Sequence, residues 1–285
     1  MTQPQSTRTM QNEEHASELE TIREGRRLVN EWFDLYNQNL SVSELVNYPL
    51  VSSGGARPGQ SNLSFSIRHQ ARGFGGGTEY RDPQWGFSLI DKIDVLQPTA
   101  VKGAVVINFR RLQPDGVTYG IGTSRVTIHT RQNGHWGFQI ISSCGLRSPE
   151  HVYNASDFEI MATVRQLIES SVDAYNRRDL AALRNCCNYP FVRLDRLDWI
   201  QADEPGALSF DFDRGHDNWE HSTVRYLDVL IPQADDKVVV DLSVARYAAN
   251  GAELPPEGSV YLVTRHDGKW GVQASSTRYA LGGLL

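Results

Sequence analysis

One predicted strand carries alternating residues that could bind a small molecule and move a proton. Trp219, His221, Thr223 and Arg225 lie two positions apart, so they share one face of a strand. A histidine exchanges protons near neutral pH, because its ordinary pKa is about 6.5. Asp217, four residues before His221, is the nearest carboxylate able to hold the imidazole in one tautomer. We therefore predict His221 as the acid or base and Asp217 as its orienting partner.

Other interpretations of these residues stay open. His221 could hydrogen-bond only a cavity water or a backbone carbonyl, and Arg225 could pair with Asp91 across an interface. The cavity could also be filled with solvent and have no use. His216, Asp217, Glu220 and His221 suggest a metal site, but Glu220 faces away from His221 on a strand and the spacing matches no known ligand set. We predict no metal and no cofactor.

The chain contains an internal repeat that shows how these residues are positioned. The segment 130–143 returns at 264–277 with seven of fourteen positions identical. Each copy predicts two strands joined by an Asn-Gly or Asp-Gly turn, in which glycine supplies the positive φ. A hairpin repeated 134 residues apart indicates a duplicated domain. Residues common to both halves are scaffold candidates, and polar residues of one half are functional candidates.

The first half fills the corresponding strand with a mainly apolar face. Its alternating residues are Trp85, Phe87, Leu89, Asp91, Ile93 and Val95. The corresponding residues of the second half are Trp219, His221, Thr223, Arg225, Leu227 and Val229. We predict that this face is the inner one in both halves. Buried polar side chains are costly unless they are satisfied. The replacement of Phe87, Leu89 and Asp91 therefore favours a binding pocket in the second half and a structural role for the first.

An arginine ends the apolar face of another strand in each half, Arg111 in the first and Arg246 in the second. Arg246 could clamp a substrate carboxylate or a developing oxyanion. It could also extend to the rim and pair with a carboxylate such as Asp228. The presence of the arginine in both halves favours the second interpretation.

The other predicted elements follow the same order in both halves. A helix at about 18–38 has an apolar stripe at Val29, Trp32, Phe33 and Tyr36, and the second-half helix also ends on Tyr-Asn. A short helix follows, with a capping box at Ser41 and Glu44 in the first half and an N-cap at Asp179 in the second. Each short helix is predicted to stop at Asn-Tyr-Pro. Four strands then form an antiparallel meander, at about 85–96, 103–112, 121–131 and 136–143, and at 219–231, 237–247, 258–266 and 270–277.

Composition limits the classes of function. A net charge of -6 over 285 residues gives no basic surface for nucleic acid, and no apolar run is long enough to span a bilayer. The polar N-terminus predicts a disordered tail without a signal peptide. Cys144, Cys186 and Cys187 predict free thiols in a reducing, cytoplasm-like compartment.

The order of elements, the Tyr-Asn helix end, Asn-Tyr-Pro and the closing Gly-x-Trp-Gly-x-Gln strand resemble the nuclear transport factor 2-like (NTF2-like) superfamily, and within it the SnoaL-like group. The resemblance implies an α+β fold with two tandem conical barrels, in each of which a curved sheet wraps around a long helix. The predicted organisation is a tail at 1–18, domains at 19–147 and 158–285, and a linker at 148–157. The two domains are expected to form a pseudo-dimer within the chain, with a further homo-oligomer left open.

The resemblance also implies a function. Many SnoaL-like proteins use a His/Asp pair for cofactor-independent proton transfer, which indicates an isomerase, lyase or dehydratase acting on a small apolar, aromatic or polyketide-like molecule. His221 and Asp217 would be catalytic, and the substrate would contact Tyr175, Arg193, Trp219, Thr223, Arg225 and Arg246. The alternative is a non-catalytic module for ligand binding or assembly, because this fold serves both purposes.

Overall fold

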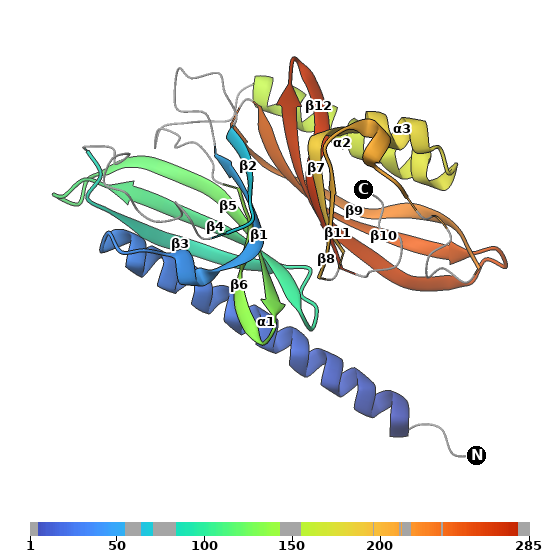
Figure 1. Cartoon of the computed structure of the whole chain (residues 1–285), viewed down its shortest axis with the longest axis horizontal. Helices are drawn as coiled ribbons and strands as arrows, with labels where there is room; N and C mark the ends of the chain where they lie inside the picture. Colours follow the sequence, from blue (N-terminus) through green and yellow to red (C-terminus); the bar gives the residue numbers. More distant parts are fainter. Residues whose placement is uncertain are drawn as a thin grey trace. The chain divides into compact units, whose positions relative to one another are not determined.

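The computed structural model describes residues 5–54, 64–70, 84–142, 155–195, 197–210, 212, 218–234 and 236–278. These residues divide into two compact units, the first within 1–151 and the second from 152 onward. Each unit has its own helices and its own six-stranded sheet (Figure 1). None of the described helices is long and apolar enough to cross a membrane.

Unit 1 consists of one long helix and a mixed sheet. Its elements are α1 (Gln5–Asn37), the 3-10 helix η1 (Ser43–Leu45), β1 (Val46–Gly54), β2 (Ser64–Arg68), β3 (Phe87–Leu96), β4 (Lys102–Leu112), β5 (Thr118–Gln132) and β6 (His135–Ser142). The strand order is β2-β1-β6-β5-β4-β3. Among the described strands of this unit, only the β1–β6 pair is parallel.

Unit 2 repeats this arrangement. Its elements are α2 (Ala155–Asn176), α3 (Leu180–Asn185), β7 (Cys187–Asp195), β8 (Asp198–Ala202), the 3-10 helix η3 (Pro205–Ala207), β9 (Trp219–Ala234), β10 (Lys237–Ala248), β11 (Glu253–His266) and β12 (Lys269–Thr277). The strand order is β8-β7-β12-β11-β10-β9, and here the parallel pair is β7–β12. The two predicted four-stranded meanders are therefore present, and each is extended by two strands that were not predicted.

Several local predictions differ from the structure. Asn-Tyr-Pro lies inside β1 and β7 and does not simply end a helix. The capping box at Ser41 and Glu44 is wrong, because η1 begins at Ser43 without a side-chain cap. In contrast, Asp179 caps α3 as predicted, accepting a hydrogen bond from the Ala182 amide at 3.0 Å.

The first helix begins earlier than predicted. α1 starts at Gln5, whereas the sequence predicts a disordered tail up to residue 18. The added segment contains glutamate, glutamine, methionine and alanine, all of which favour helix.

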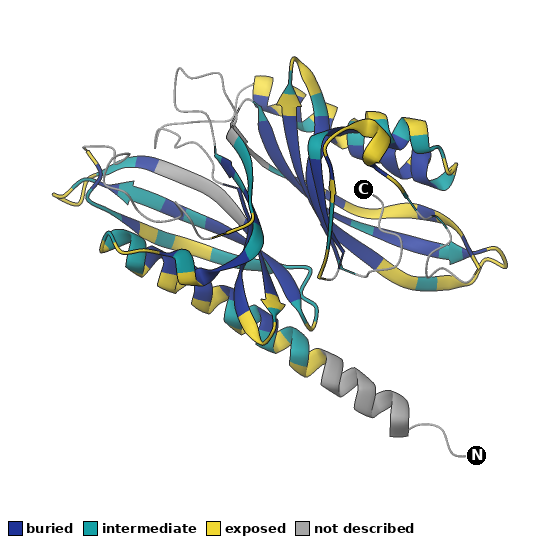
Figure 2. Ribbon diagram, viewed as in Figure 1, coloured by how far each residue is buried: buried dark blue, intermediate teal, exposed yellow. Residues whose placement is uncertain are grey.

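Each long helix buries an apolar stripe against its own sheet (Figure 2). In unit 1 the predicted stripe is confirmed, since Val29, Trp32 and Phe33 are buried and Tyr36 packs against the same core. In unit 2 the core residues of α2 are Ile160, Val164, Ile168, Val172, Ala174 and Tyr175. The interior of each unit thus lies between the helix and one face of the sheet.

A buried asparagine joins the first strand of each sheet to the closing hairpin. Pro190 has no amide hydrogen, and the pairing of β7 with β12 shifts register between Cys187 and Val192. Within this gap, the Asn188 side-chain amide donates to the Thr264 carbonyl at 2.8 Å and to Thr264 Oγ1 at 3.0 Å. Asn47 makes the same two bonds to Thr130 in unit 1, at 2.8 and 3.0 Å. The repeated motif therefore replaces the missing backbone pairing with a side chain.

The two interiors are packed differently where the helix crosses the sheet. In unit 1, the buried ring of His129 lies so close to Gly25 and Gly103 that a Cβ on either glycine would approach His129 Cε1 to 2.6 and 3.0 Å. His129 Nε2 lies 3.0 Å from the Thr21 carbonyl on α1. The repeat aligns these three positions with valines in unit 2, namely Val164, Val238 and Val263, all fully buried. Unit 1 thus has one large residue and two glycines at the three positions where unit 2 has three valines.

We predict that unit 1 loses stability in acid through His129. Burial, the largest cause, lowers the pKa of His129 from 6.5 to about 4, partly opposed by the Thr21 carbonyl and by Glu24. Because the unfolded chain binds the proton more readily, the stabilisation is complete above pH ~6.5 and is lost as the pH falls toward ~4, by about 3 kcal/mol in total. Urea unfolding at pH 7 and pH 5 measures the slope. A slope that persists unchanged in His129→Gln would contradict this origin.

We also predict that Gly25→Ala destabilises unit 1 by about 1–3 kcal/mol, because the new methyl group overpacks the His129 ring. Combining it with His129→Val should recover much of this loss, since the smaller side chain makes room. A double-mutant cycle of unfolding free energies measures the coupling. Strictly additive effects would show that the two residues do not compete for space.

Candidate functional site

The strand predicted to carry the catalytic histidine turns this residue outward. The pairing of β9 with β10 is irregular at three places, of which one is at Arg225 and another between His221 and Trp219. Each bulge reverses the alternation of side chains. Trp219 and Leu227 therefore lie in the core, whereas His221 is exposed and stacks on Tyr247 with ring centroids 5.0 Å apart. The prediction that His221 points into the interior is wrong.

The neighbouring predicted residues are also outside. Thr223 and Arg225 are exposed, and the Arg225 guanidinium pairs with Glu253 on the solvent side. Asp217 lies outside the described residues. In unit 1 the same bulge, at Asp91, leaves Leu89 exposed, while Ile93 and Val95 still pack on the core. The assumption of unbroken alternation is thus wrong in both halves for the same reason.

Four other predicted residues lie inside unit 2. Tyr175 on α2, Arg193 on β7, Trp219 on β9 and Arg246 on β10 are all at least 94% buried by residue, with exposed fractions of 2%, 6%, 4% and 5%. Arg193 shares a face with the core residue Phe191, and Arg246 continues the apolar face of β10. The interior of unit 2 therefore contains two guanidinium groups.

Strand pairing arranges the polar side chains of this interior in two rows. Arg193 pairs with Ser275, which pairs with Tyr261. Two residues further along, Asp195 pairs with Thr277, which pairs with Ser259. All of these residues are buried. The rows lie beyond the apolar end of the sheet, where Val263 and Val272 belong to the core.

Two carboxylates accompany the two guanidinium groups. Arg193 Nε lies 3.0 Å from Asp195 Oδ2, and Arg246 Nε lies 3.9 Å from Glu257 Oε2. Asp195 is held from its other side, because Thr277 Oγ1 donates to its Oδ1 at 2.5 Å. Neither Nε nor Nη1 of Arg193 makes a hydrogen bond to any described residue. The ion pair thus leaves two buried Arg193 nitrogens without a hydrogen bond to the described part of the chain.

The charged groups act together on two buried phenols. Burial is the main cause that raises the pKa of Tyr175, and Glu257 and Asp195 raise it further while Arg246 and Arg193 lower it. Burial also raises the pKa of Tyr261, which Ser259 and Arg193 lower and Glu257 and Asp195 raise. Burial lowers the pKa of Arg246, an effect that Glu257 opposes. These shared influences show that both ion pairs and both phenols form one electrostatic cluster.

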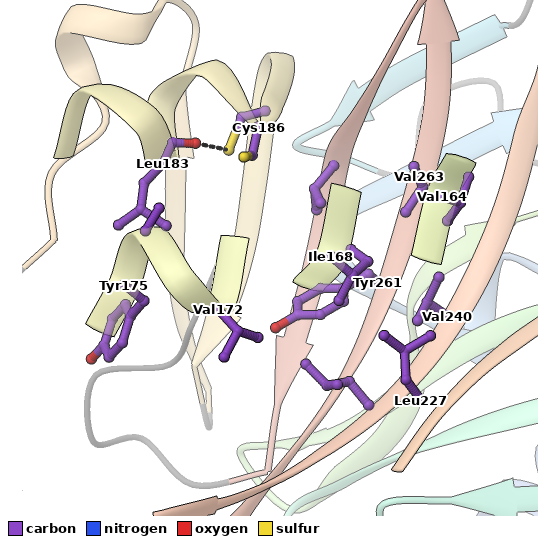
Figure 3. Close-up of a cluster of buried hydrophobic side chains, with 14 of the residues drawn as sticks. Val164, Ile168, Val172, Tyr175, Leu183, Cys186, Leu227, Val240, Tyr261 and Val263 are labelled. Carbon is purple, nitrogen blue, oxygen red and sulfur yellow. Dashed lines mark hydrogen bonds between the residues drawn. The ribbon is translucent and has the colours of Figure 1, made fainter. Parts of the chain in front are cut away.

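Aromatic rings connect this cluster to the helix. Tyr175 contacts Trp219 and Phe212, with centroids 5.0 and 5.4 Å apart, and Phe212 stacks on Phe210 at 6.2 Å. The series ends at Arg193, whose Cζ lies 5.1 Å from the centroid of Phe210. Figure 3 shows Tyr261 beside Ile168 of α2, with its hydroxyl directed away from Val263. The polar cluster is therefore bounded by aromatic residues and by the apolar core.

Unit 1 lacks the distinguishing residues of this cluster. The row Arg193–Ser275–Tyr261 corresponds to Ser52, Ile141 and Thr127, which pair in the same order. Asp195 corresponds to Gly54. Tyr36 and Trp85 keep the contact seen between Tyr175 and Trp219, with centroids again 5.0 Å apart. The scaffold is thus common to both units, and the polar row belongs to unit 2.

Sequence reasoning missed Asp195, Glu257 and Tyr261. A signal for Asp195 existed, because it lies two positions after Arg193 and would share its face of an extended segment. It was not used because no strand was predicted there. Among the residues that the structure describes, no group of three potential ligands could hold a metal ion. Cys186 and Cys187 are buried free thiols, whereas Cys144 lies outside the described part of the chain.

Comparisons with known proteins give matches in solved structures only. No family model matches the chain, and no curated protein does. An NTF2-like protein of unknown function from Pseudomonas putida KT2440 is 15% identical, covering 42% of this chain and 86% of its own, with a TM-score of 0.34. The association domain of Caenorhabditis elegans CaMKII is also 15% identical (44% and 98% covered, TM-score 0.36). A putative scytalone dehydratase from Novosphingobium aromaticivorans is 10% identical (43% and 85% covered, TM-score 0.33).

The fold is NTF2-like. What identifies it is the long helix packed on a curved sheet whose first strand pairs in parallel with the last, and both units have this arrangement. The activities and assemblies named for the similar structures remain properties of those proteins, because one NTF2-like fold can support unrelated functions. The function of this chain must be argued from its own cluster in unit 2.

Proposed function

We propose that unit 2 binds a small, mainly apolar molecule beside Arg193 and transfers a proton to or from it without a cofactor. The observation that carries this proposal is the buried guanidinium of Arg193, two of whose nitrogens make no hydrogen bond to any described residue. A buried polar group without a partner is costly. A ligand oxygen that accepts from Arg193 Nη1 would remove this cost.

Asp195 is the proposed acid–base residue, in place of His221. Its Oδ1 is fixed by Thr277, and its Oδ2 lies 3.0 Å from Arg193 Nε, which makes no hydrogen bond to a described residue. Oδ2 would take a proton from a carbon of the ligand, and Arg193 would stabilise the negative charge that develops on the adjacent oxygen. Returning the proton to another carbon gives isomerisation, and loss of a leaving group after proton removal gives elimination. Isomerase and lyase or dehydratase chemistry therefore share this first step.

A purely structural role is the main alternative for the ion pairs. However, a buried ion pair gains little over apolar residues of similar size, because desolvation offsets the attraction. Unit 1 fills the corresponding row with Ser52, Ile141 and Thr127 and still forms the same sheet. The fold therefore does not require the Arg193–Asp195 pair.

Non-catalytic ligand binding is the second candidate function. The exposed position of His221 favours this candidate, because His221 was the histidine predicted as acid or base in the interior of unit 2. In this case Arg193 and the aromatic rings would bind the ligand, and Asp195 would only balance the charge.

The test is a fragment screen by ligand-observed NMR in D2O, using a set with neutral, anionic and cationic members. We predict that hits lose affinity in Arg193→Lys, which keeps the charge but not the planar group. Arg225→Lys and His221→Phe are the controls, since both side chains are exposed in the same unit. Bound fragments with acidic C–H groups should exchange deuterium faster than in buffer.

Asp195→Asn separates the two candidate functions. It should slow catalysed exchange by ~10²–10⁴-fold while preserving binding, whereas Asp228→Asn, on the exposed face of β9, should have no effect. Binding without exchange in the wild type would favour the non-catalytic candidate. Full exchange activity in Asp195→Asn would exclude Asp195 as the acid or base.

A further inference from the structure

We infer that Arg178 is a gate of unit 2, whose side chain covers Trp219 at the surface and sets how fast a molecule enters the interior. This inference rests on the proposed function, because it assigns a control of entry to that same site. The backbone conformation of Arg178, the ring that it covers and the corresponding residue of unit 1 support this role.

Arg178 occupies a backbone position that suits asparagine or glycine better than arginine. Its φ is 54°, in the left-handed region that most side chains avoid. This conformation ends α2, because the Asp179 amide can then donate to the Ala174 carbonyl at 2.9 Å. The end of α1 has the same geometry, and there the left-handed residue is Asn39, with a φ of 61°. Unit 2 therefore has an arginine where the backbone alone favours asparagine.

The side chain of this arginine lies over a ring at the boundary of the interior. Arg178 itself is exposed, and its Cζ lies 5.4 Å from the centroid of the Trp219 ring. Trp219 is only 4% exposed, and its ring centroid lies 5.0 Å from that of Tyr175. Tyr175 in turn belongs to the buried electrostatic cluster of Arg193 and Arg246. Two rings thus separate an exposed guanidinium from the buried ones.

Unit 1 has the same pair of rings beside a shorter, uncharged side chain. The centroids of Tyr36 and Trp85 are also 5.0 Å apart, and Asn39 stands at the position of Arg178. Tyr36 is partly exposed, whereas Tyr175 is buried. Phe212 also packs on Tyr175, so Arg178 is one of two groups that close the aromatic pair in unit 2.

The contact between Arg178 and Trp219 favours the closed position but is weak enough to open. Among the described residues, the Arg178 guanidinium makes no hydrogen bond or ion pair, so the ring contact holds it. An exposed cation–π contact of ordinary strength leaves the side chain off the ring for roughly a sixth to a third of the time. Exposed side chains change rotamer within nanoseconds. Entry past Arg178 is therefore slowed and not blocked.

The first experiment measures how easily acrylamide, a small neutral quencher, reaches Trp219 in the full chain. The Trp219 fluorescence is obtained in each variant as the difference from the same variant carrying Trp219→Phe. Arg178→Asn copies unit 1 and should raise the quenching constant of Trp219 at least about twofold. Arg177→Asn removes the neighbouring exposed arginine by the same change and should leave this constant unchanged. The melting temperature of Arg178→Asn should not fall, because asparagine adopts this backbone conformation in unit 1.

The second experiment follows the binding of 4-fluoroanisole, a small apolar probe, by fluorine NMR relaxation dispersion. A gate changes the rates of entry and exit by the same factor. Both rates should therefore rise about three- to sixfold in Arg178→Asn, while the dissociation constant stays the same. Arg178→Lys keeps the cation and should remain closer to the wild type. A merely structural role of Arg178 would instead change the dissociation constant or lower the melting temperature.

The outcomes keep this inference separate from the proposed function. Equal quenching of Trp219 in Arg178→Asn and in the wild type would overturn the inference. Binding of 4-fluoroanisole with unchanged rates of entry and exit would also overturn it, and the proposed function would stand. If 4-fluoroanisole does not bind, the acrylamide measurement alone decides the inference, and the fragment screen tests the proposed function.

Discussion

The side-chain amide of Asn188 joins β7 to the closing hairpin of unit 2, and the polar rows of the interior depend on this pairing. It bridges the gap in pairing beside Pro190 by donating to the Thr264 carbonyl and hydroxyl at 2.8 and 3.0 Å. Gly271 lies against it so closely that a Cβ there would approach Asn188 Oδ1 to 2.6 Å, which explains the absence of a side chain. Once β7 is held in this register, Arg193 must pair with Ser275 and Asp195 with Thr277. The polar rows therefore follow from the clamp.

The two units show what the scaffold fixes and what it leaves free. The asparagine clamps have the same geometry, and Trp85 and Trp219 each donate to a serine three residues later, at 3.0 and 3.1 Å. The interiors differ in the size of the side chain that packs against the helix, which is His129 in unit 1 and Val263 in unit 2. They differ in chemistry near the end of the helix, where unit 2 alone has the Arg193–Asp195 pair. The same sheet thus forms with or without this ion pair.

Much of the fold could be predicted because its signals are local. The Asn-Gly and Asp-Gly turns specify the hairpins, and the stripe from Val29 to Tyr36 specifies a helix face. The strands β1 and β7 could not be predicted, because Asn-Tyr-Pro interrupts their pairing and the interruption is repaired by residues about 76 positions away in sequence. The inner face of β9 could not be predicted either. A bulge adds one residue without a sequence signal, so alternation assigns His221 and Arg225 to the wrong side.

The candidate site shows the same division between local and long-range information. Tyr175, Arg193, Trp219 and Arg246 are among the predicted substrate contacts, and the structure brings them into one buried cluster. Asp195 lies two positions after Arg193, which is a local signal, whereas Glu257 required the strand register. Glu257 reaches Arg246 only because β11 pairs with β10, and Asp195 is fixed by Thr277, 82 positions away in sequence. Ion pairs between distant segments leave no pattern in a single sequence.

We propose that the charges of the Arg193–Asp195 pair serve a ligand and are not needed for the fold. The most direct measurement is the unfolding free energy of the double variant Arg193→Leu/Asp195→Asn, which removes the ion pair but keeps the acceptor for Thr277. We expect a stability equal to that of the wild type or higher, because two buried charges no longer have to be desolvated. A loss of about 3 kcal/mol or more in a variant that still folds would contradict it and would assign the pair to the scaffold.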